Sequence, residues 1–154
     1  MVEKRKFVLP KLHHIGVAVK DIEKAVEYYS SNFGVGPFMF LDIDLPGAVT
    51  SGKSTPLKLK VGMAQMGDVI FELIQDVGEG RSARGEPISR RPKRPYHLGF
   101  LVDNLSQALA QLKRQGISVF EEGGAGNNRF AFVGSDKEES VIFELMQLEP
   151  GLLK

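Results

Sequence analysis

The sequence predicts an α+β fold built from two copies of one βαβββ module, and three observations support this prediction. The heptapeptide Val-Ile-Phe-Glu-Leu-Ile-Gln at 69–75 recurs at 141–147 with one substitution. His97-Leu98-Gly99 repeats His14-Ile15-Gly16 at an offset of 83 residues, and a helical pattern follows both. Neither half has enough strands to bury its own sheet face. We therefore expect one domain over residues 11–149.

The first module is expected at residues 11–75 and begins with a strand at 11–19. Apolar residues then recur at intervals of three and four from Ile22 to Phe33, as in an amphipathic helix. Asp21 suits the N-cap of this helix, and Gly34 suits its C-terminal end. Composition predicts further strands at 38–43, 57–66 and 69–75, with a loop at 46–56.

The second module is expected at residues 95–149, after a linker at 76–94 that is rich in Gly, Pro, Ser and Arg. The apolar positions from Leu105 to Leu112 repeat those of the first helix. Strands are predicted at 117–120, 129–133 and 141–147, with a Gly-rich turn at 123–128. Both modules thus follow the order strand, helix and three strands.

Composition narrows the class of protein. The chain has 154 residues, of which 42% are hydrophobic and 25% charged, as in ordinary soluble domains. A net charge of +1 gives no general attraction to nucleic acid or membranes, and no apolar run approaches the ~20 residues of a membrane span. The absence of cysteine excludes disulfides, thiolate metal sites and cysteine nucleophiles. We expect a cytoplasmic protein with no nucleic-acid or membrane partner.

Each repeated strand carries one glutamate among apolar residues, Glu72 in the first copy and Glu144 in the second. An ionised carboxylate in such a strand is costly unless it is paired or bound to a metal. A single case could be a satisfied hydrogen bond, whereas two at equivalent positions indicate a shared cation.

The repeat also selects the histidines. Tyr96 aligns with His13, and His97 aligns with His14, so the symmetric pair is His14 and His97. Two imidazoles and two carboxylates suit a borderline divalent ion such as Zn, Ni, Co, Mn or Fe(II), which can act as a Lewis acid on a substrate oxygen. The predicted ligands are His14, Glu72, His97 and Glu144.

These motifs resemble the vicinal oxygen chelate superfamily, which has the glyoxalase/bleomycin-resistance/dioxygenase fold. The resemblance is carried by His-Ile-Gly-Val-Ala-Val at 14–19, Phe-Glu-Leu at 71–73, His-Leu-Gly-Phe at 97–100 and Phe-Glu-Leu at 143–145. It implies that the four ligands line a cup formed by a curved sheet. It also implies that the metal chelates neighbouring substrate oxygens and that the chain forms a homodimer.

Within the superfamily the chain most resembles the methylmalonyl-CoA epimerases, at 96–104 and 126–132. That resemblance implies an isomerase that binds an acyl-CoA and one divalent ion (Co, Mn, Ni or Zn), and abstracts the α-proton to give a metal-stabilised enolate. Glu144 would then be both ligand and acid/base. The epimerases' second glutamate is missing at 55–58, and their usual His-Pro pair is replaced by Gly134-Ser135. Glu72 or a bound water is the candidate second acid/base.

Other members of the superfamily provide the alternatives. Glyoxalase I (lactoylglutathione lyase) shares a two-His, two-Glu ligand set, but the arginine and the signature expected for glutathione binding are missing. A ring-cleaving dioxygenase would need two His and one Glu, and metal-free binding or resistance proteins lack the ligand set. The segment 81–94 carries six basic residues against one glutamate. It is either a solvated linker or a contact for the phosphates of a CoA tail.

Overall fold

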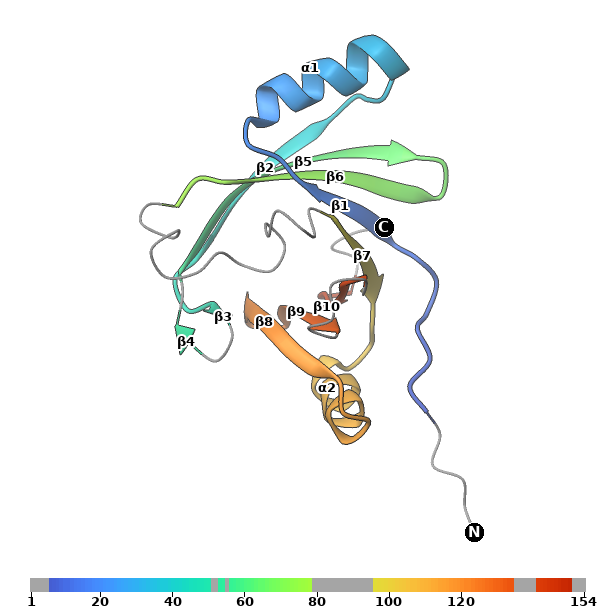
Figure 1. Cartoon of the computed structure of the whole chain (residues 1–154), viewed down its shortest axis with the longest axis vertical. Helices are drawn as coiled ribbons and strands as arrows, with labels where there is room; N and C mark the ends of the chain where they lie inside the picture. Colours follow the sequence, from blue (N-terminus) through green and yellow to red (C-terminus); the bar gives the residue numbers. More distant parts are fainter. Residues whose placement is uncertain (1–5, 51–52, 55, 79–95, 135–140, 151–154) are drawn as a thin grey trace.

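The computed structural model describes residues 6–50, 53–54, 56–78, 96–134 and 141–150. These residues form a curved mixed sheet, with the two helices at opposite ends of the molecule (Figure 1). The strand order is β2-β5-β6-β1-β7-β10-β9-β8-β3-β4. The elements in chain order are β1 (His14–Ala18), α1 (Ile22–Phe33), β2 (Met39–Leu45), β3 (Val49–Thr50), β4 (Lys53–Ser54), β5 (Leu57–Met66), β6 (Val69–Asp76), β7 (Tyr96–Leu101), α2 (Leu105–Arg114), β8 (Ser118–Ala125), β9 (Asn128–Gly134) and β10 (Phe143–Gln147).

The two modules meet edge to edge at the centre of the sheet. Strand β1 runs antiparallel to β7, its counterpart in the second module. Each of these strands pairs on its other side with the parallel glutamate-bearing strand of its own module, β6 or β10. The sheet is therefore symmetric about the β1–β7 seam, and the modules pair within one chain. The predicted α+β fold of two βαβββ modules is confirmed.

Two predicted irregular segments are partly strand. The loop expected at 46–56 contains the short hairpin of β3 and β4, and β3 pairs with the edge of β8. The Gly-rich turn expected at 123–128 begins later, because β8 continues to Ala125. A Cβ on Gly123 would press on the Phe130 ring, and one on Gly124 would overlap the backbone of Asn128. These glycines allow close packing within the sheet. The linker expected at 76–94 lies mostly outside the described residues.

The outer face of the sheet carries the helices. Helix α2 packs its buried residues against strands β7, β9 and β10 of its own module. Helix α1 fully buries only Ile22, which packs beside Gly62 of β5. The phenylalanines next to the two glutamates also face outward. The ring centroids of Phe71 and Tyr29 lie 5.0 Å apart, and those of Phe143 and Phe100 lie 5.5 Å apart.

None of the helices in the described ranges is long and apolar enough to cross a membrane.

The glutamine that ends each repeated heptapeptide has the same role in both modules. Gln75 Oε1 accepts a hydrogen bond from the first helical N–H of α1, at Ile22 (2.9 Å). Gln147 Oε1 accepts the equivalent bond from Leu105 of α2 (2.8 Å). The first N–H groups of a helix have no partner within the helix, so these bonds satisfy otherwise orphaned donors. Each glutamate-bearing strand is thereby tied to the helix of its own module.

Replacing Gln75 by Met keeps the shape of the side chain but leaves the Ile22 N–H without its acceptor. We expect the free energy of unfolding to fall by about 1–2 kcal/mol, the usual cost of losing a helix cap. Urea denaturation measures this change. Gln65→Met is the matched control, because Gln65 is exposed and bonds only to the nearby Gly67 carbonyl. An equal loss in both variants would contradict the assigned role.

Candidate metal centre

The seam between β1 and β7 brings the four predicted ligands to the concave face of the sheet. In one row across the strands, Gly16 lies between Glu72 and His97. In the next row, Gly99 lies between His14 and Glu144. Residues paired across neighbouring strands project from the same face of a sheet. Each module thus contributes one imidazole and one carboxylate, and each imidazole shares its row with the carboxylate of the other module.

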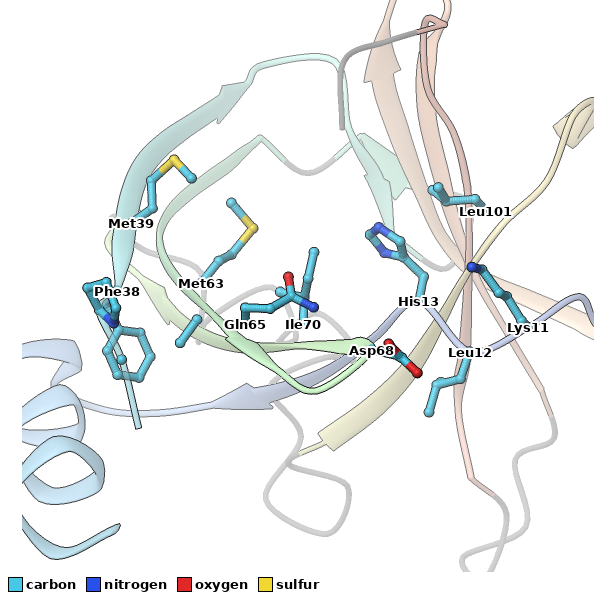
Figure 2. A pocket seen from close by; sticks show the side chains of 13 residues that line it. Lys11, Leu12, His13, Phe38, Met39, Met63, Gln65, Asp68, Ile70 and Leu101 are labelled. Atoms are coloured by element: carbon cyan, nitrogen blue, oxygen red, sulfur yellow. The ribbon is translucent and has the colours of Figure 1, made fainter. Parts of the chain in front are cut away.

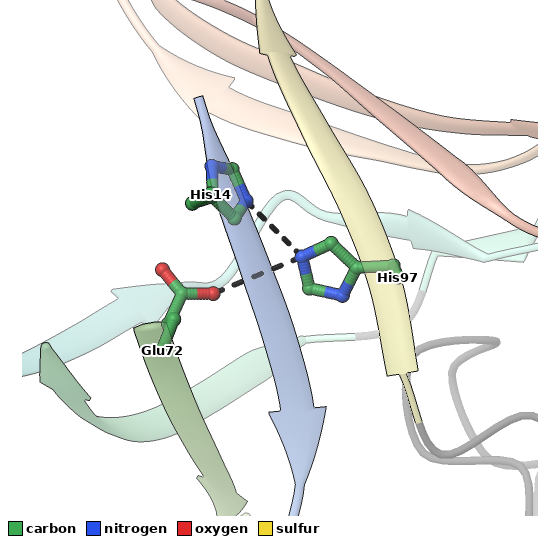
Figure 3. Close-up of side chains that lie close together, drawn as sticks. All are labelled: His14, Glu72 and His97. Atoms are coloured by element: carbon green, nitrogen blue, oxygen red, sulfur yellow. Dashed lines mark hydrogen bonds and ion pairs between the residues drawn. The ribbon is translucent and has the colours of Figure 1, made fainter. Parts of the chain in front are cut away.

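The side-chain atoms converge closely. The two Nε2 atoms of His14 and His97 lie 3.2 Å apart. His14 Nε2 lies 2.9 Å from Glu144 Oε1, and His97 Nε2 lies 3.8 Å from an oxygen of each glutamate. Ligand atoms of His14, Glu72 and His97 all lie within 4.8 Å of one another (Figure 3). Glu144 joins this group through its contacts with both imidazoles.

The two glycines of the seam make room for the imidazoles. A Cβ on Gly16 would overlap the His97 ring, and a Cβ on Gly99 would overlap the His14 ring. The His-x-Gly pattern of each module therefore has a steric basis: the glycine of one module opens the space filled by the histidine of the other. The His-x-Gly pattern is visible in both repeats of the sequence, but in the sequence analysis it was used only to align the two modules.

Burial is the largest single influence on the pKa of each of the four groups, and both histidines are only 1% exposed. Burial raises the pKa of Glu72 to about 7. Burial also acts to raise the pKa of Glu144, but its hydrogen bond to His14 and the neighbouring imidazoles hold that pKa below the usual range. Burial lowers the pKa of His97 to about 4. It acts in the same direction on His14, where the two glutamates more than offset it and raise the pKa.

Two side chains that the sequence did not assign to the site lie close to it. His13 Nδ1 is 2.9 Å from His14 Nδ1, on the side of the ring away from Glu144. Glu121, 1% exposed, pairs across strands with Phe132, which in turn pairs with Glu144. Glu121 thus faces the concave side two strands from Glu144. A bulge between Val119 and Glu121 interrupts the alternation of β8, and the strand predicted at 117–120 ends one residue before Glu121.

A cavity of about 670 Å³ lies on the first-module side, and some of its lining residues are neighbours of the candidate ligands (Figure 2). Met63, the cross-strand partner of Glu72, and Ile70, two residues from Glu72 on β6, both line it. Met39 and Phe38 add to its apolar wall, and His13 projects into it from the other side. The largely apolar cavity therefore lies beside the strand positions next to Glu72 and His14, although none of the four candidate ligands is among its lining residues.

Comparison with known proteins places the chain in one superfamily. Residues 13–132 match the Glyoxalase/Bleomycin resistance protein/Dioxygenase superfamily, and the chain belongs to it. It is 28% identical to a lactoylglutathione lyase of Schizosaccharomyces pombe over 90% of its own length, and spans about half (48%) of that relative. It is 26% identical to the mitochondrial methylmalonyl-CoA epimerase of Bos taurus, covering 90% of this chain and 75% of the relative.

Solved structures show the same fold. The methylmalonyl-CoA epimerase of Mycobacterium tuberculosis superposes with a TM-score of 0.60 at 18% identity, over 97% of this chain and 95% of that one. A Streptomyces coelicolor methylmalonyl-CoA epimerase in complex with 2-nitronate-propionyl-CoA gives a TM-score of 0.61 at 19% identity, over 90% and 97% of the two chains.

Members of this superfamily typically bind a divalent metal, and the residues present here fit one. Two buried imidazole nitrogens face each other, and each has a carboxylate oxygen within 3.8 Å. Such nitrogen and oxygen donors are the ligands that borderline divalent ions prefer. A cation between them would also offset the cost of burying two carboxylates.

We expect Gly99→Ala to disrupt the centre, because the added methyl group would overlap the His14 ring. The free energy of unfolding should fall by about 1–3 kcal/mol, as in other overpacked interiors. Divalent-ion affinity should fall at least about tenfold, since ligand orientation is lost.

Gly47→Ala is the matched control, because a Cβ there meets no atom within 4 Å. Its unfolding free energy should stay within about 0.5 kcal/mol of wild type. Chemical denaturation and competition with a chelating dye measure the two quantities. Unchanged metal affinity in Gly99→Ala would show that His14 is not held at the site by this packing.

Proposed function

We propose that the protein is a metal-dependent isomerase that epimerises methylmalonyl-CoA, or a similar acyl-CoA, by moving its α-proton. The observation that carries the proposal is the convergence of two imidazoles and two carboxylates beside an apolar cavity, in a fold shared with methylmalonyl-CoA epimerases. One divalent ion, of Co, Mn, Ni or Zn, would be held by His14, Glu72, His97 and Glu144.

The bound ion would supply Lewis acidity, lowering the free energy of negative charge on a substrate carbonyl oxygen. The chain's own residues would orient the substrate and move the proton. Met63 and Ile70, which line the cavity beside Glu72, would keep water from the reacting carbon. In a water-poor site the nearby charges act more strongly on the substrate.

Epimerisation needs a proton removed on one face of a carbon and returned on the other, so two acid/base groups are required. Glu144 flanks the histidine pair from β10, and Glu72 flanks it from β6. Glu144, as an ionised carboxylate, would take the α-proton as the C–H bond breaks. Glu72, in its protonated form, would return a proton to the opposite face as the new C–H bond forms.

Lactoylglutathione lyase activity is the second candidate. The Schizosaccharomyces pombe relative supports it, as does the presence of two glutamates rather than one beside the histidines. Both reactions transfer a proton next to a carbonyl carbon, so the same four side chains could serve either. The substrate, not the site geometry, distinguishes them. The basic segment 81–94, a candidate contact for CoA phosphates, lies outside the described residues.

A homodimer and a cytoplasmic location are parts of the same proposal. Apolar residues are exposed on edge strand β2 and on the neighbouring helix α1, where a second copy could cover them; they are Tyr28, Phe33, Met39, Phe40 and Leu41. The cytoplasmic location is the expectation from composition alone.

Divalent ions should stabilise the protein, because they bind the assembled centre and relieve the repulsion between its carboxylates. At an ion concentration 100-fold above Kd the gain is about 2.7 kcal/mol. Thermal melts with Mn, Co, Ni and Zn measure it. His97→Ala should abolish most of the shift. No shift with any of these ions would count against an enzyme and favour a metal-free binding protein.

Glu144→Gln should abolish α-proton exchange, because an amide cannot accept the proton. The loss should be about 10²- to 10⁴-fold, the usual contribution of a general base. Exchange is followed in deuterium oxide by NMR, with methylmalonyl-CoA and with the methylglyoxal–glutathione adduct. If the wild-type protein exchanged the proton of the methylglyoxal–glutathione adduct alone, lactoylglutathione lyase activity would replace epimerisation as the proposed function.

Glu72→Gln tests the second acid/base in the same assay. Its amide oxygen can still contact a metal, but it cannot carry the proton. We expect epimerisation to fall by a similar factor while the protein still folds and binds the ion. Full activity of this variant would leave Glu72 as a ligand only.

A further inference from the structure

The backbone of His13 is fixed on both sides, just before strand β1 begins. Its N–H donates to the carbonyl oxygen of Gly99 on β7 (2.8 Å), and its carbonyl accepts from the N–H of Ile70 on β6 (3.1 Å). The side chain is therefore held between the candidate centre and the neighbouring cavity, which it helps to line (Figure 2). The position is set by the sheet and not by a mobile loop.

The His13 ring meets the outward nitrogen of His14. The two Nδ1 atoms are 2.9 Å apart, with the rings perpendicular at a centroid distance of 5.1 Å. His14 Nε2 points the opposite way, towards His97 and Glu144. A histidine that binds a metal through Nε2 carries its proton on Nδ1, and that N–H needs an acceptor to fix the ring. At His14 the structure places His13 Nδ1 where this acceptor must be.

The second histidine of the centre has no such support. His97 Nδ1 is buried and has no hydrogen-bond partner among the described residues. Its ring is held instead by packing, against Gly16 on one side and Phe132 at a centroid distance of 4.9 Å. The two modules therefore orient their histidines differently, one by a hydrogen bond and one by packing.

We propose that His13 is a positioning residue that fixes His14 in its metal-binding tautomer by accepting the Nδ1–H of His14 at its own Nδ1. The inference rests on the ligand set of the proposed function. Because one nitrogen of neutral His13 is then an acceptor, its proton lies on Nε2. That N–H is available to the cavity, where it can donate to an oxygen of a bound substrate. His13 thus connects the substrate chamber to one metal ligand.

Two substitutions separate the hydrogen bond from the shape of the side chain. His13→Asn places an amide oxygen near the position of Nδ1 and keeps an acceptor for His14. His13→Leu has a similar size and no acceptor. Metal affinity of each variant is measured with Co²⁺ and Zn²⁺ by competition with a chelating dye, and metal-free melts report on the fold.

We expect His13→Leu to weaken metal binding about 10- to 100-fold, the usual effect of removing a partner of a metal ligand. His13→Asn should restore binding to near the wild-type value. Unchanged affinity in His13→Leu, or equal weakening in both variants, would overturn the proposal. In Zn-loaded wild-type protein, ¹⁵N NMR of the imidazoles should show the proton of His14 on Nδ1 and that of His13 on Nε2. A proton on Nδ1 of His13 would overturn the proposal even if the Leu variant does not fold.

These outcomes are distinct from those of the activity assay. A protein that exchanges no substrate proton, but shows the expected difference between the Leu and Asn variants, retains the role of His13 and loses the proposed reaction. A wild-type protein that binds neither Co²⁺ nor Zn²⁺ overturns both.

Discussion

The antiparallel contact between β1 and β7 is the constraint on which the candidate centre depends. Only where these strands pair do the two imidazoles approach to 3.2 Å, and only glycine opposite each ring leaves enough space. The same register places a glutamate strand on each side of the pair, so both carboxylates reach the imidazoles. The pairing of β1 with β7 thus sets the positions of the two imidazoles and the two carboxylates relative to one another.

Each glutamate-bearing strand links this centre to the rest of its module in two ways. Its side chains alternate between the two faces of the sheet, and its terminal glutamine bonds to the helix. The glutamate faces the concave side, and the neighbouring phenylalanine packs outward. The terminal glutamine caps the first turn of the helix. The glutamate, the phenylalanine and the terminal glutamine of each heptapeptide thus contact different parts of the module. These separate contacts give a physical reason for the near identity of the two heptapeptides.

The sequence predicted the parts of the molecule that depend on periodicity. The repeats identified the two modules, and alternation in the heptapeptides placed Glu72 and Glu144 on the same face. Contacts between segments far apart in the sequence could not be obtained in this way. The pairing of β3 with β8 depends on a hairpin without an apolar pattern, and Glu121 follows a bulge that interrupts the alternation along β8. Alignment of the two modules separated His13 from the symmetric pair His14 and His97, but it carried no information about the contact between the Nδ1 atoms of His13 and His14.

For the epimerisation proposed above, the twofold repeat of the fold would have a stereochemical consequence. An enzyme that interconverts two mirror-related carbon centres must accept either configuration as substrate, so its two sides must offer comparable chemistry to opposite faces of one carbon. Duplication of a module supplies this at once, with an imidazole and a carboxylate from each half. The likeness is incomplete, because Met63 adjoins Glu72 where Phe132 adjoins Glu144. Such differences can make one configuration react faster at low conversion. They cannot alter the final ratio of the two, which is a property of the substrate alone.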